Sequence, residues 1–139
     1  MKALDIAKYI VTKCVNDNCP ISNLQLQKFL FYIQKEFLAQ NKVAFYDEIQ
    51  AWQFGPVVPV VYYHFCGFGA MPITTTYTVT DICTEYQTII DSVVDKKRIL
   101  DPWEMVRETH KDHGAWDLVY MGGKGNHKEI PRDLIKRAG

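Results

Sequence analysis

The stretch SNLQLQKFLFYIQKEFLAQ, residues 22–40, decides the fold. Ser22, with Gln25 three residues later, forms a capping-box pattern, which predicts that a helix begins here. At about 100° per residue, the apolar residues fall on two stripes, roughly opposite each other: Leu26, Phe29, Leu30, Ile33 and Phe37 on one, and Leu24, Phe31 and Leu38 on the other. A surface helix needs only one apolar face. The sequence therefore predicts a central helix that the rest of the chain covers on two sides.

Residues 3–16 precede this helix and are themselves amphipathic. One broad face holds Ala3, Leu4, Ala7, Ile10, Val11, Cys14 and Val15. Asn16-Asp17-Asn18 is a helix-ending sequence, and Pro20 delays the next helix until Ser22. Two helices joined by so short a link are expected to pack as a hairpin.

The sequence after residue 40 predicts further helices and little β-sheet. Residues 48–54 alternate loosely and predict a strand that Gly55-Pro56 ends, while the Thr-rich and β-branched residues 73–79 predict a second strand beside it. The run 57–65, with Pro59 in its first turn, predicts a deeply buried helix. Later helices are expected near residues 81–95, capped by Thr80 or Asp81, and at 102–111, 115–120 and 132–137. The expected fold is mainly α (α+β), a compact single helical domain over residues 1–139 with a short two-strand element.

Charge and cysteine content limit the classes of function. Lys plus Arg and Asp plus Glu number 16 each, so no net field attracts nucleic acid or an anionic membrane. The basic run 96–98 is interpreted as the solvated end of a helix. The four cysteines form no C-x-x-C pair and are expected to be reduced, which favours the cytoplasm. The N-terminus has no signal-peptide pattern, and no apolar run is long enough to cross a bilayer.

The chemistry-bearing residues do not form a recognisable catalytic set. His110 and His113 lie three apart with Asp112 between them, but the spacing supplies no third metal ligand. Packing near Trp116 is the favoured interpretation of this pair. The glycine-rich residues 122–126 lack the Lys-Ser/Thr of a P-loop. No catalytic residue, metal ligand or cofactor is therefore predicted.

Three segments of the chain resemble those of a known family. They are MKALDIAKYI (1–10), ISNLQLQKFLFYIQ (21–34) and IQAWQFGPVVPVVYYHF (49–65). Together they resemble the Panacea domain family, which includes SocA-like antitoxins and phage-associated proteins. Within it, residues 21–32 and 51–62 correspond to the family's two motifs. Residues 101–110 and Trp116 fit the C-terminal part more loosely, because Ala115 stands where the family often has proline.

The resemblance implies a protein-binding role without catalysis. Panacea domains act as antitoxins, so the implied partner is a toxin, usually neutralised by direct contact and encoded nearby. The motif residues carried over as partner-binding are Asn23, Gln27, Lys28, Trp52, Gly55 and Pro56. Two alternatives stay open: a proteolysis adaptor for the toxin, and a small enzyme that uses His110 or His113 near Trp116. The sequence disfavours nucleic acid and membrane as partners and leaves a homo-oligomer open.

Overall fold

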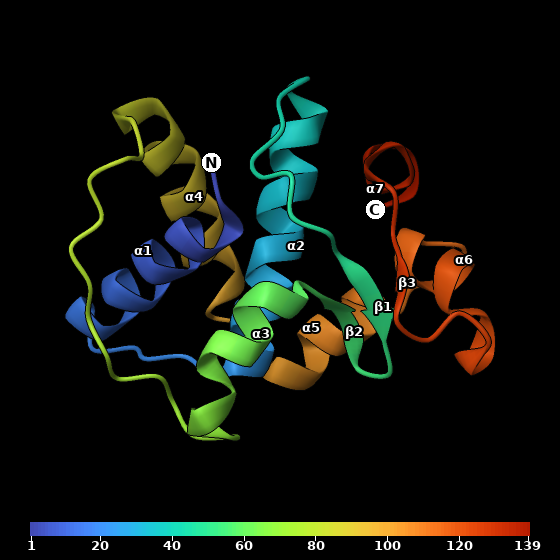
Figure 1. Ribbon diagram of the computed structural model, residues 1–139, viewed down its shortest axis with the longest axis horizontal. Helices are drawn as coiled ribbons and strands as arrows, with labels where there is room; N and C mark the ends of the chain where they lie inside the picture. Colours follow the sequence, from blue (N-terminus) through green and yellow to red (C-terminus); the bar gives the residue numbers. More distant parts are fainter.

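The computed structural model describes residues 1–139 and contains seven α-helices, two short 3-10 helices and three short strands (Figure 1). The α-helices are α1 (Ala3–Asn16), α2 (Asn23–Ala39), α3 (Pro59–Phe65), α4 (Thr84–Lys97), α5 (Pro102–Thr109), α6 (Ala115–Tyr120) and α7 (Arg132–Ala138). The 3-10 helices are η1 (Cys66–Phe68) and η2 (Met121–Gly123), and the strands are β1 (Gln50–Trp52), β2 (Gly55–Val57) and β3 (Lys128–Glu129). The fold is mainly α (α+β), as the sequence predicts. None of the helices combines the length and apolar character needed to cross a membrane.

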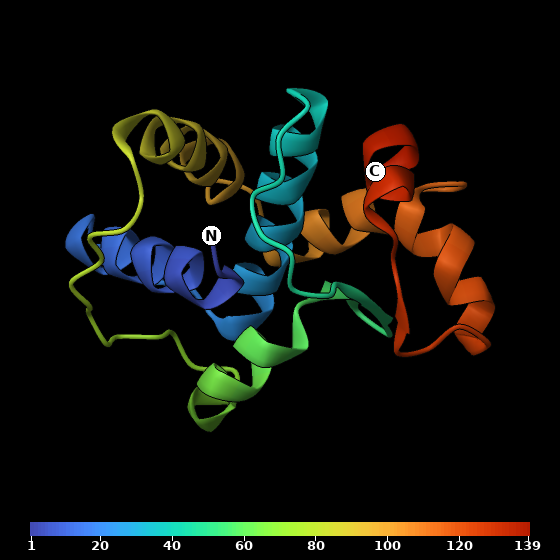
Figure 2. The same cartoon turned by 45° about the horizontal axis from the view of Figure 1, so that its top comes forward.

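Helix α2 stands at the centre of the molecule. Figures 1 and 2 place α1 and α4 on one side of it and the sheet, α6 and α7 on the other. Its first apolar stripe, Leu26, Phe29, Leu30, Ile33 and Phe37, is fully buried, and Phe31 and Leu38 of the second stripe are also buried. The predicted capping box at Ser22 and Gln25 is present at its N-terminus. The prediction of a central helix covered on two sides is confirmed.

The sheet differs from the predicted two-strand element. Its three strands are antiparallel, in the order β2-β1-β3. Gly55 and Pro56 do not end the strand region, because they belong to β2, which pairs with β1 across a tight turn. The predicted strand at 73–79 is wrong. This segment runs beside α1 and the link that follows it, where the N–H of Ile73 donates to the carbonyl of Ile21 (2.8 Å) and the N–H of Tyr77 donates to Oγ1 of Thr12 (2.9 Å).

Two helix predictions also need correction. Helix α3 begins at Pro59 rather than at residue 57, and only Val61 and Phe65 of it are buried. The prediction that this whole run is deeply buried is therefore wrong, since Tyr63 is 61% exposed. Helix α4 begins at Thr84, beyond both of the caps expected for it, and its N-cap residue is Cys83.

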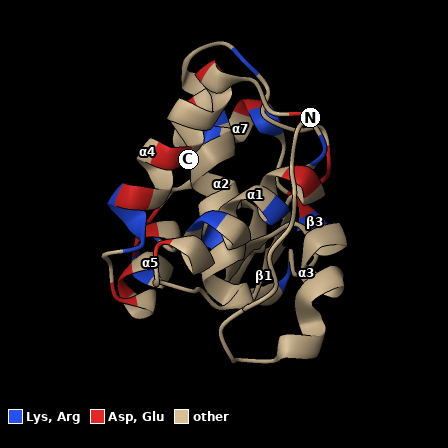
Figure 3. Cartoon of the chain, turned by 90° about the vertical axis from the view of Figure 1, so that its left-hand side faces the viewer, with Lys and Arg blue, Asp and Glu red and all other residues tan.

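Ion pairs join α1 to α4 on one side of the molecule. Lys13 pairs with Asp17 (3.0 Å) and Asp95 (3.3 Å), and Arg98 pairs with the same two carboxylates (both 2.8 Å). Figure 3 shows basic and acidic residues interspersed on this side, without a large region of one sign. Individual ion pairs near the surface contribute little to stability, so we expect these pairs to add only modestly to the packing of α1 against α4.

Candidate functional site

The first turns of α2 hold the chain between β2 and α3 through a buried amide network. Gln27 Nε2 donates to Asn23 Oδ1 (2.9 Å), and Gln27 Oε1 accepts from the N–H of Val58 (2.9 Å). Asn23 Nδ2 donates to the carbonyl of Tyr62 (3.1 Å). Both amide side chains are buried. Asn23 and Gln27 are four residues apart and therefore lie on one side of the helix. From there they bind the backbone of Tyr62 and Val58 and so join α2 to α3 and to the residue before it.

Lys28 lies beside this network and directly against β2. Its side chain is 1% exposed, and its ammonium group has no hydrogen-bond partner. Burial lowers the pKa of Lys28 to about 7. A Cβ at Gly55 would lie 2.7 Å from both Cε and Nζ of Lys28, and Gly55 has a φ of +122°. Only glycine lacks the Cβ that would clash with Lys28 and also adopts this positive φ readily.

Trp52 is the one predicted partner-binding residue that reaches the surface. Asn23, Gln27, Lys28, Gly55 and Pro56 are buried, whereas Trp52 is half-buried. Its indole N–H donates to Gln50 Oε1 (2.9 Å), and its carbonyl accepts from the indole N–H of Trp116 (2.7 Å). The structure therefore brings all six residues into one region, with five of them beneath the surface.

Three aromatic side chains surround Trp52, and we call the four residues together the Trp52 cluster. The indole stacks on His127 (ring centroids 4.4 Å apart) and meets Tyr62 edge-on (5.0 Å) and Tyr63 at a tilt (6.1 Å). Tyr63 and His127 are exposed and Tyr62 is half-exposed. Val60, one turn before Tyr63 on α3, is 50% exposed as well. The cluster is a partly open aromatic surface on a buried polar support.

The sequence does not single out Tyr62, Tyr63 or His127 as contact residues. The two tyrosines lie in a run that was expected to be buried, and no local pattern distinguishes them from core residues. His127 reaches Trp52 because β3 pairs with β1, and its N–H donates to the carbonyl of Ala51 (2.7 Å). A separation of 75 residues between Trp52 and His127 leaves no signal in the local sequence.

His110 and His113 lie in different surroundings. The ring of His110 stacks on Trp116, with centroids 3.6 Å apart, and Trp116 in turn stacks on Tyr120 (4.5 Å). Burial and the nearby Lys28 lower the pKa of His110. His113 is exposed in a left-handed turn, where its backbone N–H donates to Asp117 (3.0 Å). The packing of the first histidine near Trp116 is as the sequence predicts.

No set of residues is arranged to hold a metal ion. The structure contains no group of three or more His, Cys, Asp or Glu side chains placed for that purpose. The four cysteines are free thiols, of which Cys14 is buried and Cys19, Cys66 and Cys83 are exposed. Burial raises the pKa of Cys14 to about 11, so this thiol stays protonated at neutral pH.

Comparison with known proteins identifies the family. The family described as "Antitoxin SocA-like, Panacea domain" matches residues 26–117. Antitoxin SocA of Caulobacter vibrioides (strain NA1000 / CB15N) is 29% identical over 130 residues, which cover 84% of this chain and 69% of that protein. No solved structure matches the chain. The matched range includes α2 from Leu26 onward, the β1–β2 hairpin and Trp116, and the chain belongs to the family of SocA-like antitoxins with a Panacea domain.

Proposed function

We propose that this chain neutralises a partner toxin by direct protein–protein contact, and that the Trp52 cluster is the centre of the contact surface. The toxin is expected to be encoded beside the chain. The observation that carries the proposal is the partly open stack of Trp52 with His127, Tyr62 and Tyr63. Trp and Tyr are enriched among the few residues that supply most of the binding energy of an interface.

The support beneath the cluster favours a binding role. A contact residue contributes most when its position is fixed before binding, because little conformational freedom is then lost. The carbonyl of Trp52 is held by Trp116, and the carbonyl of Tyr62 is held by Asn23. A stable interface needs roughly 800 Å² on each partner, so neighbouring exposed residues such as Val60 are expected to contribute to the contact.

The proposal treats the buried motif residues as positioning residues. Asn23, Gln27 and Lys28 lie below the surface. They affect partner binding only by positioning the segments that they contact. Catalysis is not part of the proposed function, since neutralisation by contact consumes no substrate. The free thiols favour a reducing compartment, and we place the chain in the cytoplasm as part of this proposal.

The test is co-expression with the toxic reading frame encoded beside the chain, scored by growth. Tyr63→Ala and Trp52→Ala are expected to weaken toxin binding by about 2 kcal/mol or more each, a typical cost for central aromatic contacts. The matched control is Trp103→Ala, because Trp103 is 59% exposed and makes none of the aromatic contacts of the cluster. Thermal melts of each variant separate lost contact from lost stability. Full rescue by both cluster variants would remove the Trp52 cluster from the proposal.

Two further measurements address the other candidate mechanisms. If the chain delivers the toxin to a protease, the toxin level falls when the chain is present and recovers in a protease-deficient host. If the chain is an enzyme, His113→Ala or His110→Phe abolishes rescue while melting and toxin binding are unchanged. His110→Phe is used because it keeps an aromatic ring against Trp116.

A further inference from the structure

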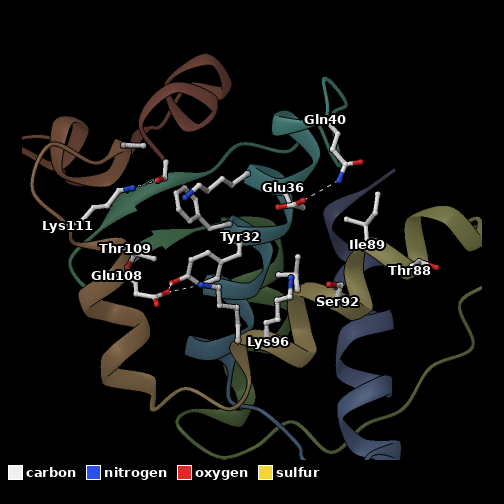
Figure 4. A pocket seen from close by; sticks show the side chains of 16 residues that line it. Tyr32, Glu36, Gln40, Thr88, Ile89, Ser92, Lys96, Glu108, Thr109 and Lys111 are labelled. Carbon is white, nitrogen blue, oxygen red and sulfur yellow. Dashed lines mark hydrogen bonds and ion pairs between the residues drawn. The ribbon is translucent and has the colours of Figure 1, made fainter.

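A cleft of about 730 Å³ opens between α2 and α4, with α5 and the end of α7 at its rim (Figure 4). Phe31 and Tyr32 of α2 and Ile89 and Val93 of α4 provide most of its apolar lining, and Ala115 of α6 completes it. Its volume is within the range of pockets that bind small molecules and short segments. No residue of the Trp52 cluster lines it, so the cleft is a separate feature of the molecule.

Lysine dominates the charged lining of the cleft. The charged side chains are Lys35, Lys96, Lys97 and Lys111 on one hand and Glu36 and Glu108 on the other. Glu108 is already occupied, because it accepts from Lys97 (2.9 Å) and from the hydroxyl of Tyr32 (2.7 Å). Glu36 accepts from the side-chain amide of Gln40 (3.2 Å). Since the whole chain has no net charge, this excess of lysine is local.

Two of the lysines have neither an ion-pair nor a hydrogen-bond partner. Lys35 and Lys96 are exposed to the cleft and form no ion pair, and Lys111 donates to the backbone oxygen of Gly139. Burial, followed by the charges of Lys111 and Lys97, lowers the pKa of Lys35. An anion placed between α2 and α4 would relieve this repulsion. Of the basic run 96–98, interpreted from the sequence as a solvated helix end, Lys96 and Lys97 line the cleft.

The lining favours carboxylates of a protein segment over a nucleotide. Both aromatic rings of the lining are buried, and the ammonium group of Lys97 lies over the face of Tyr32, 4.2 Å from its centroid. No aromatic face is thus free to stack on a base. The lining contains no arginine, which is the side chain suited to bidentate contact with phosphate. The hydroxyls of Thr88 and Ser92 and the apolar Ile89 and Val93 suit the mixed surface of a peptide.

We propose that this cleft is a second docking site for the toxin and that it takes an acidic peptide segment of that protein. Carboxylates of the segment pair with Lys35 and Lys96, and its apolar side chains pack against Ile89 and Val93. The inference depends on the proposed function only for the identity of the partner. Separate contacts through the cleft and the Trp52 cluster would act together, since the second contact forms at a high effective concentration.

A labelled peptide tests the chemistry of the cleft without the toxin. The probe is a fluorescein-labelled peptide of Glu and Leu residues, with a Gln and Leu peptide as its neutral counterpart and ATP as a competitor. The acidic peptide is expected to bind, and more weakly as salt is added, because exposed charges are screened. Lys35→Gln with Lys96→Gln is expected to weaken binding roughly tenfold, as loss of two attractive charges does at an interface. Lys2→Gln with Lys124→Gln removes the same charge from exposed lysines outside the cleft and is expected to change nothing.

Three results would overturn the inference. They are no binding of the acidic peptide, equal binding of the peptide by the wild type and the cleft double variant, and displacement of the peptide by ATP at low concentration, which indicates a nucleotide site.

The same double variants are then measured for toxin binding and rescue, with melting temperatures as the stability control. Roughly tenfold weaker toxin binding by the cleft variant alone supports the second docking site. If Trp52→Ala reduces toxin binding and the cleft variant does not, the cleft inference fails while the proposed function stands. If the wild-type chain binds no toxin, the proposed function fails and the peptide experiment still decides the chemistry of the cleft.

Discussion

Lys28 places an ionisable group inside the core without a counter-charge. Burial lowers its pKa from the usual 10.5 to about 7 in the folded chain. In the unfolded chain the side chain is hydrated and its pKa returns to the usual value. Between these two pKa values the unfolded state binds more protons than the folded state, so the free energy of unfolding rises as pH increases through this window. Below the lower value both states are protonated, and the folded state carries the full cost of the buried charge.

Lys28→Met is expected to remove this dependence on pH. Methionine fills a similar volume and carries no charge, so the variant should be more stable than the wild type near pH 7. The measurement is urea unfolding from about pH 7 to about pH 9, because above pH 9 the raised pKa of Cys14 acts in the opposite direction. Lys2→Met, at an exposed lysine, is the control. Parallel pH profiles for the wild type and Lys28→Met would contradict the assignment of the slope to Lys28.

At the scale of elements, the amide network makes α2 the support of α3. Gln27→Ala leaves the buried N–H of Val58 without its acceptor, which typically costs about 1–3 kcal/mol. The loss should appear in thermal and urea unfolding, and toxin binding should fall only in proportion to the lost fold. Gln40→Ala, at an exposed amide of the same helix, should change stability by less than about 0.5 kcal/mol. Weaker toxin binding by Gln27→Ala with unchanged melting would instead indicate that Gln27 contacts the partner.

Helix α2 was predictable because its signals are local. The capping box lies within four residues, and the periodicity of the apolar stripes lies within the helix itself. The sheet was not predictable in the same way. Gly55 and Pro56 read as a strand end, yet β2 lies at the edge of the sheet, where proline is tolerated because no further strand needs its N–H.

The remaining errors have the same origin in contacts between distant segments. Residues 73–79 are extended, as their composition predicts, but they follow α1 because Ile73 and Tyr77 find their hydrogen-bond acceptors there. In α3, Val61 and Phe65 face inward at a spacing of four, while Tyr63 lies outside. Aromatic composition alone does not separate a core face from a contact surface. The motif residues do lie together in one region, but the burial of each of them depends on the distant segments that pack over it, β3 and α3.

At the scale of the whole molecule, the range that the family description matches is smaller than the set of elements that bury the core. The family match covers residues 26–117. Outside it lie α1 and the C-terminal segment 128–139. Helix α1 contributes Ala3, Ile6, Ala7, Ile10, Val11 and Cys14 to the core, and the C-terminal segment contributes Ile130, between β3 and α7, and Ile135 of α7. The N–H of Ile130 also donates to the carbonyl of Ile49 (2.7 Å) and so ties the C-terminal segment to the start of the sheet.

We therefore propose that residues 1–139 form one cooperative folding unit. Calorimetry of the full chain is expected to show one transition with equal calorimetric and van't Hoff enthalpies, the behaviour of a two-state domain. The segment 26–117 alone is expected to lack a cooperative transition, because removal of α1 and α7 uncovers apolar residues on both sides of α2. The measurement for this segment is far-UV circular dichroism during heating. Two longer segments are compared with it: 1–117 keeps α1 on one side of α2, and 26–139 keeps α7 on the other. If segment 26–117 melted cooperatively near the temperature of the full chain, α1 and α7 would be additions to a smaller folding unit, and the central position of α2 would not require both of its covers.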